Sequence, residues 1–271
     1  MSRLPTYYVS HGGGPWPWMR EQTGGRYDRL EASLQAMAQA TDGQVRAILV
    51  VTAHWETPAF ALSSSPQPGM IYDYHGFPPH TYQVHYRAPG SPALAQRALT
   101  LLQAGGVQAR LDPARGFDHG TFSALQAAYP EAQIPVVQLS IRADFDPAAH
   151  LAAGRLLAPL RDEGILIIGS GLSYHNLRLL NPAGTLPSQQ FDAWLQETLT
   201  ASTPAERDAR LRRWEAAPSA RIAHAREDHL IPLMVTVGAA HDEPGTCVYH
   251  EDLFMGVVAA SSFRFGAVPA A

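Results

Sequence analysis

Histidine is the residue type in this sequence that points most directly to chemistry. The chain of 271 residues contains 12 histidines, and imidazole titrates near neutral pH and is the commonest metal-binding side chain. Five stand after apolar segments or beside glycines, and we expect these to be functional: His11, His54, His119, His175 and His229. We expect His75, His80 and His85 to be pocket-wall or surface residues of a covering loop, and the others to be ordinary surface or partly buried residues: His150, His224, His241 and His250.

His11 lies in the segment SHGGGPWPWM (residues 10–19), whose glycines and prolines are poor material for a core element. Gly12 to Gly14 indicate close approach of the backbone to another group. A phosphate-binding loop would need G-x-G-x-x-G or G-x-x-x-x-G-K-[ST] after a strand. The segment matches neither pattern, and the chain contains no lysine. Two interpretations remain, which are the oxyanion hole of a hydrolase and a metal-binding turn.

The hydrolase interpretation rests on HGGG, an oxyanion-hole motif of some lipases and esterases. Such an enzyme places its nucleophile in G-x-S-x-G, and the segment Gly171-Leu172-Ser173-Tyr174-His175 nearly matches. His175 replaces the last glycine, however, and its side chain would crowd the tight turn. This interpretation also leaves His54 and His119 without a role. A serine hydrolase with Ser173 as nucleophile is kept as an alternative.

The metal interpretation uses more of the sequence. Several histidines without cysteine pairs favour a metal bound through imidazole, such as iron, zinc, nickel or copper. A zinc deaminase would pair His54-Trp55-Glu56 with two cysteines, and the single cysteine, Cys247, excludes that class. The glycines beside His11 and His119 leave room for a substrate next to the metal.

The elements that must position these histidines are strands and helices of an α/β fold. Short apolar, β-branched runs predict buried strands of a mostly parallel sheet, with helices on both faces. The strands are expected at Thr6–Ser10, Val45–Ala53, Ile134–Ile141 and Ile165–Ile168. His11, His54 and His175 follow three of them. Ligands bind at the carboxyl ends of strands in such sheets, so we expect these three side chains to converge.

The other segments complete one domain that we expect to span residues 1–271. Helices are predicted at Pro92–Gln103 and Pro147–Arg161, and a solvated helix in the charged stretch Thr203–Ala220. Residues 66–90 are expected to form a loop and a strand pair that cover one end of the sheet. Further strands are predicted near the C-terminus, at Thr246–Phe254 and Ser262–Phe265.

Composition limits the partners and the compartment. The formal net charge is -4, and no basic stripe suggests nucleic-acid binding. The N-terminus lacks the apolar region of a signal peptide, and no apolar run reaches transmembrane length. With a single cysteine the chain fits a reducing compartment. We therefore expect a cytoplasmic protein that contacts neither nucleic acid nor membrane, and a homo-oligomer remains open.

Six motifs occur together and in order along nearly the whole chain, and together they carry a resemblance. The sequence resembles the class III extradiol ring-cleavage dioxygenases, most closely their 4,5-DOPA dioxygenase branch. The motifs are HGGGP at 11–15, AHWE at 53–56, YHGFP at 74–78, DHGTF at 118–122, GSGLSYHNL at 169–177 and DHLIPLMVTVGAA at 228–240.

The resemblance implies an enzyme with a non-haem Fe(II) cofactor that inserts both atoms of O2 into a catechol ring. By similarity, His11, His54 and His229 are metal ligands, and Asp228 orients His229. His175 is implied as the acid–base residue, and His119 as the residue that orients O2 or the substrate oxygen. Zn(II) is a second metal that the purified protein is expected to accept, with His175 as a further ligand.

The first motif departs from the H-G-S-P-M common in the DOPA branch, because it reads H-G-G-G-P here. This leaves the particular catechol open. Aromatic residues are expected to wall a flat ring: Trp16, Trp18, Tyr74, Phe77 and Tyr82. Arg87, Arg142 and Arg178 are candidates for a substrate carboxylate. A non-catalytic metal-binding relative is a further alternative, against which the presence of both His119 and His175 argues.

Overall fold

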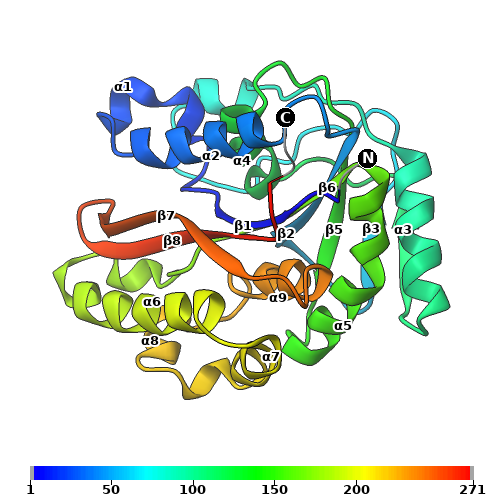
Figure 1. The fold of residues 1–271 in the computed structure, drawn as a ribbon. Coiled ribbons are helices and arrows are strands. Elements are labelled where there is room, and N and C mark those ends of the chain that lie inside the picture. Colours follow the sequence, from blue (N-terminus) through cyan, green and yellow to red (C-terminus); the bar gives the residue numbers. More distant parts are fainter. Residues whose placement is uncertain (1–2, 269–271) are drawn as a thin grey trace.

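The apolar runs form the centre of an eight-stranded sheet in the computed structural model, which describes residues 3–268 (Figure 1). The strand order is β4-β3-β5-β2-β6-β1-β8-β7. The strands are β1 (Thr6–Ser10), β2 (Ala47–Thr57), β3 (Phe60–Ser63), β4 (Ala109–Asp112), β5 (Val136–Arg142), β6 (Ile165–Gly171), β7 (Gly245–Phe254) and β8 (Val258–Phe265).

The four central strands are parallel to one another, and their outer neighbours β3 and β8 join them in antiparallel orientation. β5 pairs with β2, β2 with β6, and β6 with β1, all in parallel. β8 pairs with β1 in antiparallel orientation and forms a hairpin with β7. Because β1, β2 and β6 run in the same direction, their carboxyl ends meet at one edge of the sheet. The predicted fold class is confirmed.

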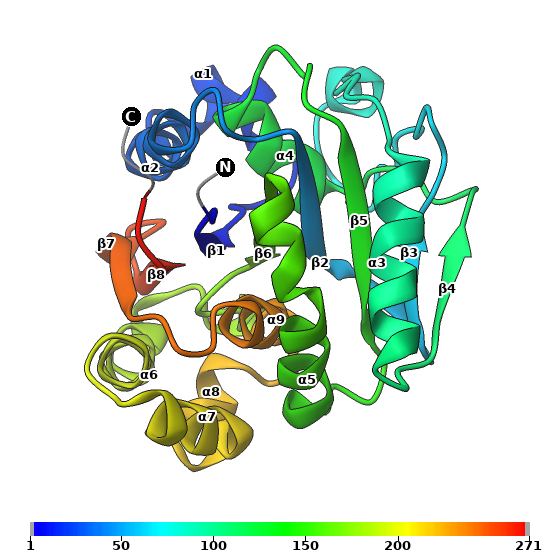
Figure 2. The same cartoon turned by 45° about the vertical axis from the view of Figure 1, so that its right-hand side comes forward.

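Helices cover both faces of the sheet, as Figures 1 and 2 show. α2 and α4 lie on one face, and α5, α6 and α9 on the other, with α3 beside α5. The helices are α1 (Arg20–Thr23), α2 (Asp28–Ala40), α3 (Pro92–Ala104), α4 (His119–Ala128), α5 (Pro147–Leu157), α6 (Thr185–Thr200), α7 (Pro204–Arg212), α8 (Ala220–Ala223) and α9 (Ile231–Ala239).

Local chemistry explains where the predicted helices begin. Ser91 accepts a hydrogen bond from the backbone N–H of Leu94 at the start of α3. Asp146 does the same for Ala148 at the start of α5. A side-chain acceptor at this position satisfies a backbone donor that the helix itself cannot pair. α5 ends at Leu157, four residues before the predicted end, and continues as a 3-10 helix over Ala158–Glu163.

Three expectations for the elements are wrong. β2 does not end at Ala53 but runs on to Thr57 through a register irregularity between Val51 and Glu56. Residues 66–90 form no strand pair, and a single bridge joins Met70 to Phe117. The charged stretch Thr203–Ala220 was expected to form a solvated helix, but Arg207 and Leu211 of its helix α7 are buried.

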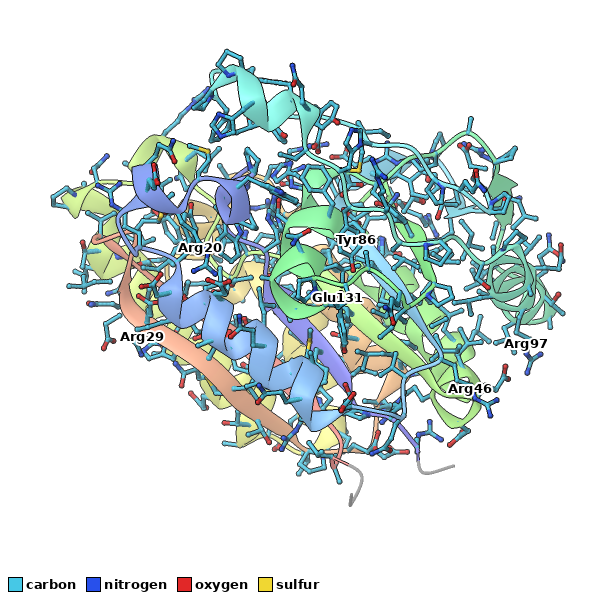
Figure 3. All side chains as sticks on the ribbon, turned by 90° about the horizontal axis from the view of Figure 1, so that it is seen from above. Arg20, Arg29, Arg46, Tyr86, Arg97 and Glu131 are labelled. Atoms are coloured by element: carbon cyan, nitrogen blue, oxygen red, sulfur yellow. The ribbon has the colours of Figure 1, made fainter. Side chains whose placement is uncertain are left out.

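Charged side chains are spread around the molecule. In the view from above, Arg29 lies at one side, and Arg46 and Arg97 lie at the opposite side (Figure 3). Arg97 forms an ion pair with Glu163.

Among residues 3–268, no helix is both long and apolar enough to cross a bilayer.

Candidate functional site

The five histidines singled out from the sequence line one cavity of about 880 Å³. His11 follows β1 directly, and His175 lies four residues after the end of β6. His54 lies inside β2, at its irregular part, rather than after it. His119 is the first residue of α4, and His229 lies two residues before α9. The loops and strand ends at one edge of the sheet therefore bring together side chains that are far apart in the sequence.

Three of these imidazoles point their Nε2 atoms at one another. The Nε2 of His54 lies 3.3 Å from that of His11 and 3.2 Å from that of His229. Two nitrogens that bind one metal at about 2.0–2.1 Å each lie roughly 3 Å apart. The separations found here therefore fit a single ion between the rings, and the ligand atoms of all three residues lie within 4.8 Å of one another.

Carboxylates hold two of these rings from behind. The Nδ1 of His229 lies 2.7 Å from Asp228 Oδ2, and the Nδ1 of His54 lies 3.1 Å from Asp73 Oδ2. A proton on Nδ1 that is donated to a carboxylate leaves the lone pair of Nε2 free for a metal. The Nδ1 of His11 is buried and has no partner among the described residues. Asp228, expected to orient His229, contacts the Nδ1 of that ring.

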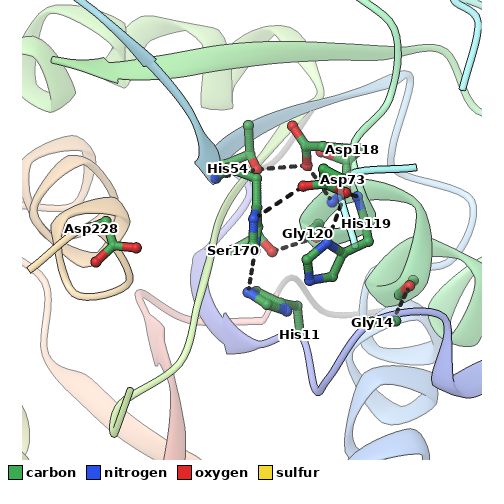
Figure 4. A network of polar contacts seen from close by, with 12 residues as sticks. His11, Gly14, His54, Asp73, Asp118, His119, Gly120, Ser170 and Asp228 are labelled. Atoms are coloured by element: carbon green, nitrogen blue, oxygen red, sulfur yellow. Dashed lines mark hydrogen bonds and ion pairs between the residues drawn. The ribbon is translucent and has the colours of Figure 1, made fainter. Parts of the chain in front are cut away.

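Asp73 joins two histidines. Its Oδ1 accepts from the Nδ1 of His119 at 2.8 Å, while its Oδ2 faces His54 (Figure 4). Sequence reasoning missed Asp73, which immediately precedes the YHGFP motif in the loop over residues 66–90. Asp73 is the single acidic residue of this stretch, but no local pattern marks it as the partner of two histidines.

A second layer of contacts ties His54 to the start of α4. Asp118 caps this helix, and its Oδ1 accepts from the Thr52 hydroxyl at 2.8 Å. Arg115 donates to Asp118 Oδ2 at 2.6 Å and to the backbone oxygen of His54 at 3.1 Å. Because α4 begins at His119, this network sets the position of His119 relative to His54 (Figure 4). The two ring centroids lie 3.9 Å apart.

Burial keeps several of these imidazoles neutral. It lowers the pKa of His11 and His229 well below the ordinary value, and neighbouring histidines lower it further. Burial also lowers the pKa of His54, but Asp73, Asp118 and Asp228 outweigh it and the net shift is upward. Metal ligands must be deprotonated to bind, so the neutral imidazoles of His11 and His229 are ready to accept an ion.

The two carboxylates have different electrostatic states. Burial would raise the pKa of Asp73, but the hydrogen bonds of His119 and His54 outweigh burial and hold this pKa well below the usual range. Burial raises the pKa of Asp228 to about 6, against the opposing effect of Arg226. Asp73 is therefore the more firmly ionised of the two carboxylates.

His175 and His119 face the same space as the three converging rings. The ring of His175 stacks on His229 with centroids 3.3 Å apart and an angle of 13° between the planes. Burial, ahead of the neighbouring histidines, lowers the pKa of His175 to about 3. Burial likewise lowers the pKa of His119, although Asp73 opposes the shift.

The glycine segment after His11 makes a turn that side chains would block. Gly12 has a φ of 79° and Gly14 a φ of 55°, a conformation that glycine adopts without strain. A Cβ on Gly12 would lie 2.5 Å from the Nε1 of Trp16. That Nε1 donates to the backbone oxygen of His11 at 2.7 Å. The absence of a side chain at Gly12 therefore lets Trp16 lie close to the turn and hydrogen-bond to the backbone of His11.

The cavity walls differ in part from those expected. Trp16, Tyr74 and Phe77 line the cavity, whereas Trp18 and Tyr82 do not. None of the arginines suggested for a substrate carboxylate lines it: Arg87, Arg142 and Arg178. Arg26 and Arg226 do so instead, and Arg226 forms a two-pronged ion pair with Glu56.

Ser173 is not placed as a nucleophile. Its side chain is buried, and its Oγ accepts from the backbone N–H of Ser261 at 2.8 Å. His224 contacts the backbone oxygen of Ser173 rather than its hydroxyl. Ser173 does not line the cavity, while His54 and His119 do. The alternative of a serine hydrolase lacks the geometry of an activated serine.

Residues 4–266 match the family described as the catalytic LigB subunit of aromatic ring-opening dioxygenase. The chain belongs to this family. A protein named 4,5-DOPA dioxygenase extradiol from Beta vulgaris is 40% identical over 225 residues, which cover 81% of this chain and 82% of the relative. A protein of the same name from Escherichia coli K12 is 34% identical over 98% of this chain and 96% of its own.

Two further proteins are similar to this chain along nearly its whole length. The dioxygenase tasH of Hapsidospora irregularis is 36% identical over 95% of this chain and 84% of its own length. The crystal structure of an uncharacterized protein, JW3007, from Escherichia coli K12 has a TM-score of 0.76 at 32% identity. It covers 97% of this chain and 100% of that one. The resemblance seen in the six motifs is thereby confirmed, and the chain has dioxygenase relatives along nearly its whole length.

Proposed function

We propose that this protein is an Fe(II)-dependent extradiol dioxygenase that opens a catechol-type ring with O2. The observation that carries the proposal is the convergence of three Nε2 atoms at the strand ends, at separations of 3.2 and 3.3 Å. His119 and His175 border the same cavity. Family membership supports a ring-opening dioxygenase, and the histidine set supports a metal of the borderline type.

In this proposal His11, His54 and His229 hold the metal, with Asp73 and Asp228 fixing the rings of the latter two. A bound Fe(II) supplies the redox chemistry by which O2 and the aromatic ring react. Three imidazoles leave further coordination positions for the substrate oxygens and O2. Because the ligands are neutral, the ion keeps its positive charge, which favours a deprotonated catechol.

His175 and His119 serve the proton chemistry. A catechol must lose protons before both oxygens can bind a metal, and the neutral imidazole of His175 is a proton acceptor at this cavity. The negative charge of an arriving catecholate favours the protonated ring, so His175 can later return the proton. The Nδ1 of His119 donates to Asp73, which leaves its Nε2 to accept a hydrogen bond from a substrate hydroxyl.

Zn(II) fits the same three nitrogens but cannot change its redox state. A protein loaded with Zn(II) is therefore expected to bind catechols without opening them. The stacking of the His175 ring on His229 supports His175 as a further ligand after a side-chain rotation.

The test is to strip the metal, reload Fe(II) without air, add a panel of catechols and then admit O2. Oxygen uptake and the absorbance of a ring-opened product are followed together. We expect uptake that requires Fe(II) and disappears in His11→Ala. Loss of uptake across the panel, with catechols still bound, would favour a non-catalytic metal-binding relative. Ester hydrolysis by the metal-free protein would instead restore the serine hydrolase.

A further inference from the structure

The cavity has two chemically different ends. The inner end carries the histidines together with Asp73 and Asp228. The outer end is mainly apolar, and four separate segments of the chain build it. Its apolar side chains are Met19, Phe77, Leu177, Leu180, Phe254 and Met255, and the polar Gln22, Thr23 and Arg26 also line the cavity. A ligand that fills the cavity must therefore present a polar edge inward and an apolar body outward.

The volume is larger than one catechol ring requires. Pockets of roughly 300–1,000 Å³ enclose ligands of drug size, and this cavity has about 880 Å³. A catechol bound at the histidines leaves the outer end to water. Filling that end with an apolar group removes apolar surface from water on both partners, which is favourable in proportion to the area buried.

The carboxylates around the cavity do not favour an ammonium group on the substrate. Three carboxylates line it, and each is already engaged: Glu56 with Arg226, Asp73 with His54 and His119, and Asp228 with His229. An ammonium group on the substrate would have to compete for one of them, and an unpaired charge that loses its water is costly.

We propose that the substrate is a catechol whose ring carries a bulky apolar substituent without an ammonium group, such as an alkyl chain or a second ring. The substituent lies against Leu177, Leu180 and Phe254 at the outer end, while the two hydroxyls face the histidines. The inference rests on the proposed function for the catechol edge and on the apolar lining for the substituent.

Leu177 offers a direct probe of this surface. Its side chain is 64% exposed at the cavity mouth, so a polar replacement does not disturb a packed core. Leu186 is 63% exposed on α6 and does not line the cavity. The two leucines have the same exposure and differ in whether a ligand reaches them, so Leu186→Gln is a matched control for Leu177→Gln.

The experiment measures the Kd of 4-alkylcatechols, from methyl to hexyl, by calorimetry with the Zn(II)-loaded protein, in which no turnover occurs. We expect the Kd to fall about two- to fourfold with each added methylene, and DOPA to bind at least about tenfold more weakly than 4-propylcatechol. The preference of Leu177→Gln for the hexyl over the methyl compound falls about fivefold, whereas Leu186→Gln keeps the preference of the unmodified protein.

A Kd that does not change with chain length, or DOPA binding more tightly than 4-propylcatechol, would overturn the inference. The proposed function is judged separately, from O2 uptake by the Fe(II)-loaded protein. Ring opening without a chain-length gradient contradicts the apolar substituent alone. A gradient in Kd without any ring opening contradicts the dioxygenase proposal and leaves the apolar ligand site supported.

Discussion

Two groups of buried histidines lie in this protein, and they differ in what their nitrogens face. At the site, His54 and His229 each have a carboxylate behind one nitrogen and another imidazole in front of the other. Elsewhere, His150 uses both nitrogens on the backbone: Nδ1 donates to the Asp146 oxygen, and Nε2 accepts from the Arg142 N–H. His224 contacts the Ser173 oxygen and packs against Phe191 and Trp214.

Burial alone does not mark a functional histidine in this protein. Burial lowers the pKa of His150 and of His224 to about 4, and it lowers the pKa of His11 and His229 as well. The partners separate the two groups. A carboxylate behind the ring and an open cavity before it suit metal binding. His150 instead has both nitrogens engaged by the backbone, and His224 packs among aromatic side chains outside the cavity.

Replacing one histidine of each group by glutamine should give the largest difference in metal binding and ring opening. His54→Gln removes the central nitrogen of the proposed metal site and one partner of Asp73, so we expect metal binding to weaken at least about a hundredfold and ring opening to be lost. His150→Gln should keep metal binding and turnover within about twofold of the unmodified protein. Metal competition with a chelator and O2 uptake measure both effects, and equal losses in the two variants would refute the division.

Asp73→Asn should have the next largest effect. An asparagine offers one acceptor oxygen, while His54 and His119 both donate from Nδ1, so one ring would face an NH2 group. We expect metal affinity and kcat/KM each to fall about a hundredfold. This is the upper end of the loss usually seen when a residue that hydrogen-bonds a metal ligand is replaced. Unchanged metal affinity in the folded variant would show that Asp73 does not position His54.

Asp228→Asn should be milder, because Asp228 serves a single histidine. The amide oxygen of asparagine can still accept from the Nδ1 of His229. We expect a loss of about tenfold or less in metal affinity, measured by the same chelator competition. A larger loss than that of Asp73→Asn would reverse the ranking of the two carboxylates.

The smallest effect concerns stability rather than the site. The pKa of His150 is about 4 in the folded protein and about 6.5 in an unfolded chain. Between these values the unfolded state binds more protons, so the free energy of unfolding falls as the pH is lowered from about 6.5 to 4. Protonation of His150 alone accounts for about 3 kcal/mol over this range.

His150→Gln removes this contribution, so its free energy of unfolding should vary less steeply over the same pH range. At pH 7 the variant is expected to be about 1–2 kcal/mol less stable, since glutamine does not reproduce both backbone hydrogen bonds. Urea unfolding at a series of pH values measures both quantities. Parallel curves for the variant and the unmodified protein would show that His150 does not titrate in this way.

The fold followed from local patterns because apolar runs and helix caps act over short distances. Thr6–Ser10 agrees with β1, and the cap at Ser91 marks the start of α3. The end of β2 was missed because the strand continues through the polar residues His54 and Glu56, where an irregular register lets side chains reach the cavity. α2 and α6 were missed because their apolar positions are sparse.

The candidate site was partly visible in the sequence. Histidines beside strand ends and glycines carried their signal locally. Asp73 did not, because its importance depends on how the loop over residues 66–90 folds back onto β2 and α4. His150 and His224 were expected to be surface or partly buried residues and are fully buried, since no local pattern reveals hydrogen bonds to distant backbone groups.

The central claim is that one metal held by His11, His54 and His229 carries the activity. The most direct test is to titrate the metal-free protein anaerobically with Fe(II) and measure catechol-dependent O2 uptake at each addition. We expect the rate of O2 uptake to rise linearly up to one Fe(II) per chain, with one O2 consumed for each ring opened. Full uptake without added Fe(II), or a rise unaffected by His11→Ala, would contradict it.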